Sequence, residues 1–223
     1  MRALLVANAD DADPGFVGHH LRKRGYAFTE LLREHPGEWP GLEGVELVVL
    51  LGSEWSVYWP SVTESVRAES ALVRAARDRA TPLFAICYGS QLVARTFGGH
   101  VARAAVPEIG WVDVHSDEPA IAAGPWLEWH GDVVTLPAGA TELARNGCGP
   151  QAWRLGRILA TQFHPEATET MLARWTAGGG GEELAKVGLT RDELMAETRA
   201  DVKVSRKHAE RLTDWFLETI AGG

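Results

Sequence analysis

Short apolar runs alternate with amphipathic stretches over most of the chain. The runs within residues 1–8, 45–51, 83–86 and 157–163 predict core strands, of the apolar kind that is buried on both faces of a parallel sheet. The stretches between them carry apolar residues at helical spacing. This alternation predicts an α/β fold with a central, largely parallel (mixed) sheet that is flanked by helices.

Local signals place the predicted helices. A helix over residues 13–24 begins with an Asp-Pro pair, which supplies an N-cap and a proline at the first helical position. Ser61 and Glu64 form a capping box for a helix over residues 61–79. A third helix over residues 91–97 ends at a Gly-Gly pair. The apolar residues expected on the inner face of the second helix are Val62, Val66, Leu72, Val73 and Ala76.

The pattern changes after residue 101 to short alternating pieces separated by Gly and Pro turns. Such pieces are typical of antiparallel strands. We expect a small antiparallel extension of the sheet, which delivers the segment after residue 160 to the same edge as the parallel strands. Its predicted strands cover residues 109–115, 132–136, 141–145 and 151–155.

The last part of the chain carries no catalytic signature. Four consecutive glycines within residues 177–181 predict a flexible joint, and helices follow it. We therefore expect one domain over residues 1–176 and a helical extension over residues 177–223 packed on the same domain. The extension either covers the core or presents a docking surface for a partner. The residues spaced for packing in the last helix are Leu212, Trp215, Phe216 and Ile220.

The composition fits a single globular domain, because 223 residues with 45% hydrophobic and 23% charged side chains can bury one sizeable core. The formal net charge of -8 argues against a nucleic acid or an anionic membrane as a partner. Two cysteines are too few for a disulfide framework, and a functional thiol needs a reducing compartment, so we expect a cytoplasmic location. We expect no signal peptide and no membrane span.

Cys87 lies where a predicted strand gives way to a helix. Such a turn strains its central residue and needs small residues two positions before and after it, where the chain has Ala85 and Gly89. The turn aims the thiol at a helix N-terminus, whose partial positive charge favours the thiolate. It leaves the main-chain N–H of Tyr88 to stabilise an oxyanion. An isolated cysteine is usually an inert small hydrophobe, but these neighbours favour a nucleophile.

A His-Pro-Glu segment follows the last predicted strand. In an extended chain, residues i and i+2 project to the same side, so His164 and Glu166 share a face. A carboxylate on one imidazole nitrogen fixes the tautomer and leaves the other nitrogen to exchange a proton with Cys87. Alone, the pair would be an ordinary surface histidine beside a glutamate. With Cys87 it predicts a base and its orienting group.

These motifs resemble those of the class I (triad) glutamine amidotransferase family, whose pattern is a small-x-Cys-x-Gly-x-Gln elbow and a downstream His-Pro-Glu. The resemblance extends over most of residues 1–176 and includes the segments at residues 50–56 and 129–132. It implies the flavodoxin-like class I glutaminase fold. It also implies a catalytic triad of Cys87 as nucleophile, His164 as base and Glu166 as orienting group.

The resemblance further implies the substrate contacts. Gln91 and the backbone near Gly52 and Ser53 would hold a glutamine-like molecule, and Ser53 and Tyr88 would supply the oxyanion hole from their main-chain N–H groups. The family's usual Gly-Gly-Pro reads Gly-Ser-Glu at residues 52–54. A serine retains the main-chain donor, although its backbone has less conformational freedom than that of glycine.

Several other residues have no settled role in the pattern. Trp55, Tyr58 and Trp59 follow the Gly-Ser-Glu loop and either wall the site or pack the loop onto the domain. For His130 the resemblance implies a structural or substrate-proximal role. We expect no metal there, because no second His, Cys or carboxylate lies at ligand spacing on a predicted element, and no cofactor. Cys148 is expected in a turn.

Three functions are compatible with these residues. The first is cysteine-dependent glutaminase activity through a γ-glutamyl thioester, which supplies ammonia to a separate synthase subunit. The second keeps the chemistry but releases another amine, as a stand-alone hydrolase of γ-glutamyl amides or peptides. The third is a non-catalytic regulatory or binding subunit on the same fold.

Overall fold

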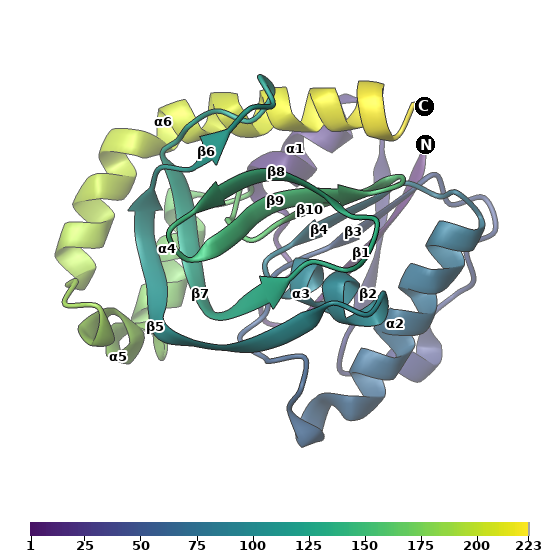
Figure 1. Ribbon diagram of the computed structural model, residues 1–223, viewed down its shortest axis with the longest axis horizontal. Helices are drawn as coiled ribbons and strands as arrows, with labels where there is room; N and C mark the ends of the chain where they lie inside the picture. Colours follow the sequence, from purple (N-terminus) through teal and green to yellow (C-terminus); the bar gives the residue numbers. More distant parts are fainter. Residues whose placement is uncertain (223) are drawn as a thin grey trace.

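In the computed structural model, which describes residues 1–222, an eight-stranded mixed sheet runs through the molecule (Figure 1). Its parallel part follows the order β2 (Ala27–Leu32), β1 (Arg2–Ala7), β3 (Leu47–Leu50), β4 (Leu83–Ile86) and β10 (Ile158–Thr161). Three antiparallel strands continue it: β9 (Gly149–Leu155), β8 (Thr141–Asn146) and the short β6 (His115–Ser116). The predicted α/β class and the antiparallel extension are confirmed.

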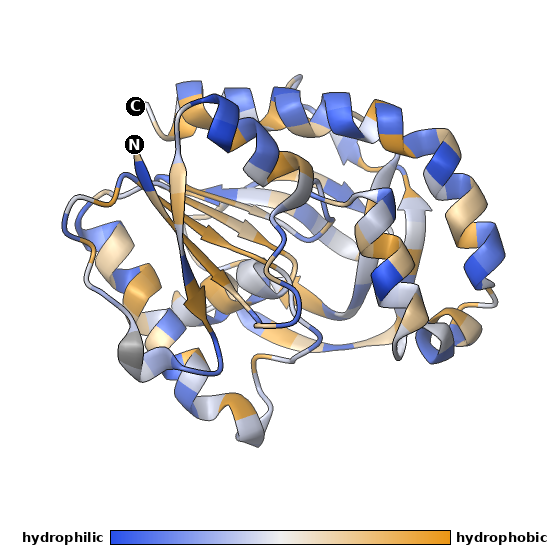
Figure 2. Ribbon diagram, turned by 180° about the vertical axis from the view of Figure 1, so that it is seen from behind, coloured by the Kyte–Doolittle hydropathy of each residue, from blue (hydrophilic) through white to orange (hydrophobic). Residues whose placement is uncertain are grey.

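Helices cover both faces of this sheet. The helices α2 (Thr63–Asp78) and α3 (Tyr88–Thr96) pack on one face, and α1 (Gly15–Lys23) and α6 (Arg191–Trp215) pack on the other. Successive residues of β3 therefore join opposite cores: Val48 faces α2 and α3, and Val49 faces α1 and α6. Figure 2 shows these strands mainly in orange and the helices in mixed colours, as expected for strands buried on both faces.

A separate two-stranded ribbon stands beside the main sheet. It pairs β5 (His100–Val112) with β7 (Trp126–Thr135) in antiparallel register, with an irregularity between Arg103 and Glu108. The sequence predicted only the two ends of this ribbon, at residues 109–115 and 132–136. The missed half of β7 packs on α4 (Glu169–Ala177) and α5 (Gly180–Lys186) through Leu127 and Trp129, and the missed half of β5 joins the main core through Val101.

All three predicted helix starts are wrong, and the third helix begins at Tyr88 and not at residue 91. The first helix begins at Gly15 with Pro14 at the N-cap, and Asp13 accepts a hydrogen bond from the N–H of Gly15 at 2.9 Å. The second begins at Thr63, because a 3-10 turn (Pro60–Val62) occupies the positions of the expected capping box. The apolar inner face of that helix is nevertheless buried as predicted, at Val62, Val66, Leu72, Val73 and Ala76.

One residue of the glycine run is packed, whereas Gly179 and Gly181 have open space around them. Gly180 already belongs to α5, and a β-carbon there would lie 2.8 Å from the ring of Trp129. After α6, a π-helical turn (Phe216–Ile220) ends the tail, and Leu212, Phe216 and Ile220 are buried in the core shared with the sheet. We propose that the tail after α4 is an extension of the same domain. No helix within residues 1–222 is long and apolar enough to cross a membrane.

Candidate active site

Three neighbouring strands end at one edge of the sheet, and the segment after each carries a predicted site residue. Gly52 follows β3, Cys87 follows β4 and His164 follows β10, which are adjacent in the sheet. Ligands of such sheets collect at the carboxyl ends of the strands. A cleft of about 560 Å³ opens here and is lined by all three residues. The sheet order therefore brings together residues that are far apart in the chain.

Cys87 has the strained backbone that the sequence predicted. Its φ of 49 and ψ of -107 are unusual for a non-glycine residue, and its N–H donates to the carbonyl of Thr161 on β10 at 2.8 Å. The helix α3 begins at the next residue, so the buried thiol lies at a helix N-terminus. Gly89 must be small, because a β-carbon there would lie 2.8 Å from the Leu50 carbonyl oxygen.

His164 and Glu166 form the predicted pair. His164 Nδ1 donates to Glu166 Oε1 at 2.8 Å, and both side chains are buried. This bond leaves Nε2 for other chemistry, and Nε2 has no hydrogen-bond partner in the described residues. Burial lowers the pKa of His164, but the neighbouring charges of Glu166 and Cys87 outweigh burial and hold this pKa well above its usual range. The imidazole is therefore disposed to carry a proton beside the thiol.

Gly52 lies against both of these residues. A β-carbon at Gly52 would lie 2.9 Å from His164 Cε1 and 3.6 Å from Cys87 Cβ. The loop thus approaches the base so closely that only glycine fits without displacement. This contact also shows that Cys87 and His164 border the same small space.

We expect Gly52→Ala to lower kcat by roughly 10- to 100-fold, because the added methyl pushes His164 away from Cys87 and small misplacements of catalytic groups are costly. The thermal unfolding midpoint should stay close to that of the wild type. Steady-state kinetics and thermal melts of Gly52→Ala check both. The matched control is Gly37→Ala, where a β-carbon meets nothing within 4 Å. Wild-type turnover by Gly52→Ala would show that the contact is unimportant.

A buried arginine, which the sequence reasoning missed, fixes the Gly52 loop. Arg33 is wholly buried, and its guanidinium donates to the carbonyls of Leu51 at 2.7 Å and of Gly52 at 2.9 Å. In a trans peptide, N–H and C=O point in opposite directions. Because the Gly52 carbonyl points at Arg33, the N–H of Ser53 points away from Arg33.

The charge of Arg33 is balanced by Glu69 on α2. Its Nε lies 3.1 Å from Glu69 Oε2, and Glu69 also accepts a hydrogen bond from the Tyr88 hydroxyl at 3.2 Å. Burial raises the pKa of Glu69, although the charge of Arg33 opposes the shift. The Tyr88 side chain is thus buried in the core shared with α2 and α3, and it does not line the cleft. The hydrogen bonds of Arg33 and Glu69 thus connect the Gly52 loop, which carries Ser53, with Tyr88. Ser53 and Tyr88 are the two residues whose main-chain N–H groups are the predicted oxyanion donors.

Comparison with known proteins decides the family. A profile described as "Glutamine amidotransferase class-I" matches residues 44–174. The chain belongs to this family. GMP synthase [glutamine-hydrolyzing] of Mycobacterium marinum is 32% identical over 152 residues, which are 63% of this chain, and that of Thermomicrobium roseum is 37% identical over 136 residues, which are 56% of this chain. The chain covers 27% and 24% of these two relatives, or about a quarter of their length.

Solved structures agree over nearly the whole chain. A glutamine amidotransferase from Thermotoga maritima has a TM-score of 0.86 and 26% identity, covering 98% of this chain and 99% of that one. A glutamine amidotransferase from Methylobacillus flagellatus has a TM-score of 0.84 at 20% identity, covering 99% of this chain and 94% of that one, and shows the same fold. The flavodoxin-like class I fold that the motifs implied is thus confirmed for this amidotransferase-family chain.

The predicted substrate contact Gln91 lies in the amidotransferase cleft with a partner that the sequence reasoning missed. Gln91 Nε2 donates to Gln162 Oε1 at 3.3 Å, and Gln162 Nε2 donates to Cys87 Sγ at 3.5 Å. Both glutamine side chains are buried. Gln162 lies two residues before His164 in the sequence. Because residues i and i+2 of an extended segment project to the same side, its position beside the thiol could have been inferred.

The aromatic loop over residues 55–59 contributes fewer side chains to the cleft than its composition suggests. Trp55 lines the cleft, whereas Tyr58 uses its hydroxyl to donate to Asp132 at 2.8 Å and so anchors the loop to β7. Trp59 is 40% exposed. Two other tryptophans that the sequence reasoning did not single out, Trp129 and Trp175, line the cleft instead. They come from β7 and α4, whose approach to the site depends on the tertiary fold.

His130 borders the cleft, and its ring points at the carboxylates of Glu108 and Glu128. The expectation that no carboxylate lies at ligand spacing from His130 is therefore wrong. Glu128 lies two residues before it on β7, and Glu108 lies directly opposite on β5. Burial lowers the pKa of His130, but the neighbouring carboxylates of Glu108 and Glu128 raise it to about 10. Cys148 lies in the turn between β8 and β9, as predicted, and both cysteines are free.

Proposed function

We propose that this amidotransferase-family chain hydrolyses the side-chain amide of glutamine with Cys87 as nucleophile and supplies ammonia to a separate synthase. The observation that supports this most is the placement of a strained, buried thiol at a helix N-terminus, next to a histidine held by a glutamate, in one cleft. The free thiol that this chemistry needs favours a reducing compartment, and we propose a cytoplasmic location.

The proposed reaction runs through a thioester. The Cys87 thiolate attacks the amide carbon of glutamine, and the N–H groups of Ser53 and Tyr88 stabilise the oxyanion. His164 then gives its Nε2 proton to the departing nitrogen, and ammonia leaves. His164 next accepts a proton from water, whose oxygen attacks the γ-glutamyl thioester, and glutamate is released with the thiol restored. Glu166 orients the imidazole throughout and does not itself change protonation.

The proposal of a synthase partner is based on the relatives of this chain. Those named above are glutamine-hydrolysing GMP synthases, in which the matching segment is about a quarter of the protein. We propose that the ammonia formed at Cys87 passes to an acceptor bound by a synthase of that general kind. The acceptor itself would be chosen by the synthase and not by the cleft described here.

A second candidate function is favoured by the size of the cleft. Its volume of about 560 Å³ lies within the roughly 300–1,000 Å³ that suits ligands of drug size, which are larger than glutamine. Three tryptophans, Trp55, Trp129 and Trp175, line it. The same thiol chemistry would then cleave a γ-glutamyl amide or peptide, and the aromatic walls would receive the leaving amine.

The two functions differ in substrate preference without a partner. We would measure glutamate and amine release from glutamine and from a panel of γ-glutamyl amides and peptides, with Cys87→Ala as the blank. Weak or glutamine-only activity supports the amidotransferase, and brisk cleavage of a bulky γ-glutamyl compound supports the stand-alone hydrolase. A non-catalytic subunit would release neither product, and its Cys87 would not be alkylated stoichiometrically by a glutamine-like electrophile.

The proposed role of Glu166 predicts a shift in pH dependence. Glu166→Gln removes the negative charge that raises the pKa of His164, so this pKa falls and the protonated imidazole is lost at a lower pH. We expect the alkaline limb of kcat/KM to move to lower pH, and kcat to fall by roughly 10²- to 10⁴-fold while some activity remains. Rate profiles of wild type and variant check this. The exposed Glu169→Gln serves as control, and an unmoved alkaline limb would refute the proposed role.

A further inference from the structure

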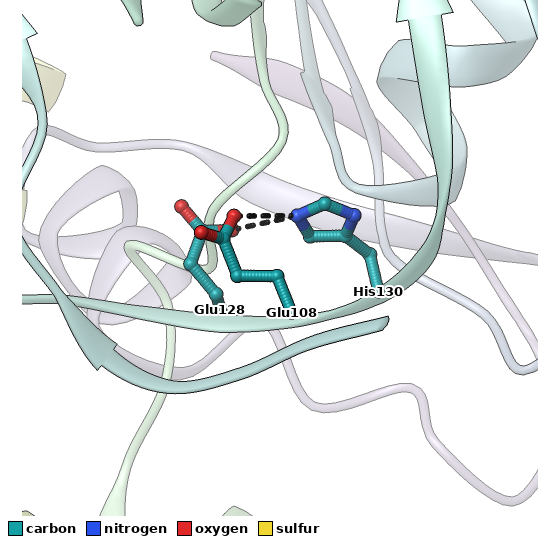
Figure 3. Close-up of side chains that lie close together, drawn as sticks. All are labelled: Glu108, Glu128 and His130. Carbon is teal, nitrogen blue, oxygen red and sulfur yellow. Dashed lines mark hydrogen bonds and ion pairs between the residues drawn. The ribbon is translucent and has the colours of Figure 1, made fainter. Parts of the chain in front are cut away.

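Three side chains outside the proposed triad converge on one point beneath the ribbon. Figure 3 shows Glu108, Glu128 and His130 with both carboxylates turned toward the same imidazole nitrogen. His130 Nε2 lies 3.1 Å from Glu108 Oε2 and 3.4 Å from Glu128 Oε2. Strand geometry produces this arrangement, because Glu128 and His130 share a face of β7 and Glu108 is the cross-strand partner of His130.

The other nitrogen of His130 determines what Nε2 can do. Nδ1 lies 2.9 Å from the main-chain carbonyl oxygen of Asp132, and a carbonyl only accepts, so Nδ1 carries the proton. In a neutral imidazole, Nε2 then presents a lone pair to two carboxylates, which is repulsive. A proton or a metal ion at Nε2 would remove this repulsion. A histidine that donates its remote N–H to a backbone carbonyl is also the usual arrangement of a metal ligand.

Glu128 gives an independent reason to consider a metal ion. Its side chain is wholly buried, and neither carboxylate oxygen has a hydrogen-bond partner among the described residues. A proton on His130 Nε2 would be shared mainly with Glu108 Oε2 at 3.1 Å, and Glu128 Oε2 would remain at 3.4 Å without a hydrogen bond. A buried carboxylate without partners is strongly disfavoured, so Glu128 either holds a proton, since burial raises its pKa, or binds a cation that the described residues do not supply.

We propose that Glu108, Glu128 and His130 bind one divalent transition-metal ion of the Zn²⁺ or Mn²⁺ kind. Two atoms bound to one ion at about 2.1 Å lie roughly 3.0 Å apart in octahedral and 3.4 Å apart in tetrahedral geometry. The separations of 3.1 and 3.4 Å fall in this range. A divalent ion also cancels the two negative charges and gives Glu128 the partner that it lacks. Imidazole with carboxylates suits these ions.

The surroundings fit a structural ion. Glu108 is oriented by Asn146 Nδ2 at 2.9 Å and by Gln151 Nε2 at 3.3 Å, as expected for a ligand held by outer hydrogen bonds. Its side chain is 14% exposed, which gives an ion a route from solvent. Between Glu128 and His130 lies Trp129, whose carbonyl accepts from the Cys87 thiol at 3.8 Å. The ion would thereby fix the strand that forms this wall of the cleft.

Calorimetric titration with ZnCl₂ and with MnCl₂ tests the proposal without using turnover. The full chain should carry Cys87→Ala and Cys148→Ser, so that neither thiol binds the metal, and should be stripped with a chelator first. We expect one ion per chain and a higher thermal unfolding midpoint with metal. Adding Glu128→Gln, which removes a charge and little volume, should weaken binding by roughly tenfold or more. Glu30→Gln, at an exposed carboxylate on β2, should leave it unchanged.

Two results would overturn the site. One is the absence of saturable binding by the folded double variant at millimolar metal. The other is binding that Glu128→Gln leaves undiminished, which would assign the ion elsewhere and a proton to His130. If Glu128→Gln does not fold, the absorption spectrum of Co²⁺ added to the Cys87→Ala, Cys148→Ser protein decides. The site requires ligand-field bands of Co²⁺ bound by nitrogen and oxygen ligands. A spectrum with the bands of hydrated Co²⁺ alone would refute the site.

Discussion

Cys87→Ala is expected to reduce turnover by roughly 10⁴-fold or more, to the level of a protein-free blank, because no other group in the cleft can form the thioester. The structure gives a reason for so large an effect. The thiol is held at a strained turn, next to the imidazole that exchanges its proton, and at a helix N-terminus that stabilises its charge. A side chain elsewhere could not reproduce these three features together.

The assay is glutamate release by the purified variant under saturating substrate. His164→Ala should lose about as much activity, and the double variant should lose little more than either single one, because a nucleophile and its base act as a unit. Cys148→Ala is the control, since that thiol lies in the turn after β8 and should leave the rate unchanged. Full turnover by Cys87→Ala would exclude the mechanism.

Arg33→Met is expected to lower the free energy of unfolding by about 3–5 kcal/mol, because it leaves Glu69 buried without its counter-charge. It should also reduce activity, since the carbonyls of Leu51 and Gly52 lose the donor that orients the loop. Urea unfolding gives the first quantity and steady-state kinetics the second. Arg79→Met, which breaks an exposed pair with Glu43, should leave the free energy of unfolding nearly unchanged.

A second substitution separates the two effects of Arg33. In Arg33→Met with Glu69→Gln, the uncompensated charge is gone, so we expect a free energy of unfolding above that of the single variant. The loop still lacks its donor, so activity should stay low. A double variant that regains activity together with stability would show that Arg33 acts only through the fold. A single variant as stable as the wild type would contradict the argument about the buried pair.

The parallel half of the fold and the three convergent site residues follow from local signals. The strands before Gly52, Cys87 and His164 are short apolar runs, and a parallel sheet places their carboxyl ends at one edge. The elbow around Cys87 needs small residues at fixed positions, which the sequence displays directly. These features depend on neighbours within a few residues, so a single chain suffices to predict them.

The features that sequence reasoning missed depend on pairing between distant segments. Arg33 follows β2 and Glu69 lies on α2, and nothing in either segment marks them as partners. Glu108 meets His130 only through the register of the ribbon, whose bounds were predicted too short. The capping box at Ser61 failed for a local reason instead, because a proline-led 3-10 turn took its place. Register and long-range contact therefore limit what the sequence alone reveals.

The position of β10 has a consequence for the order in which activity arises. This strand is inserted between β4 and β9, yet it is made long after β4, and chains fold from the N-terminus during synthesis. Until it docks, the edge of β4 is unpaired, and the N–H of Cys87 lacks its acceptor, Thr161. The thiol then also lacks His164, which β10 carries into place. On the proposed mechanism, a nascent or partly folded chain would therefore be inactive, and Cys87 would become a nucleophile only when β10 docks.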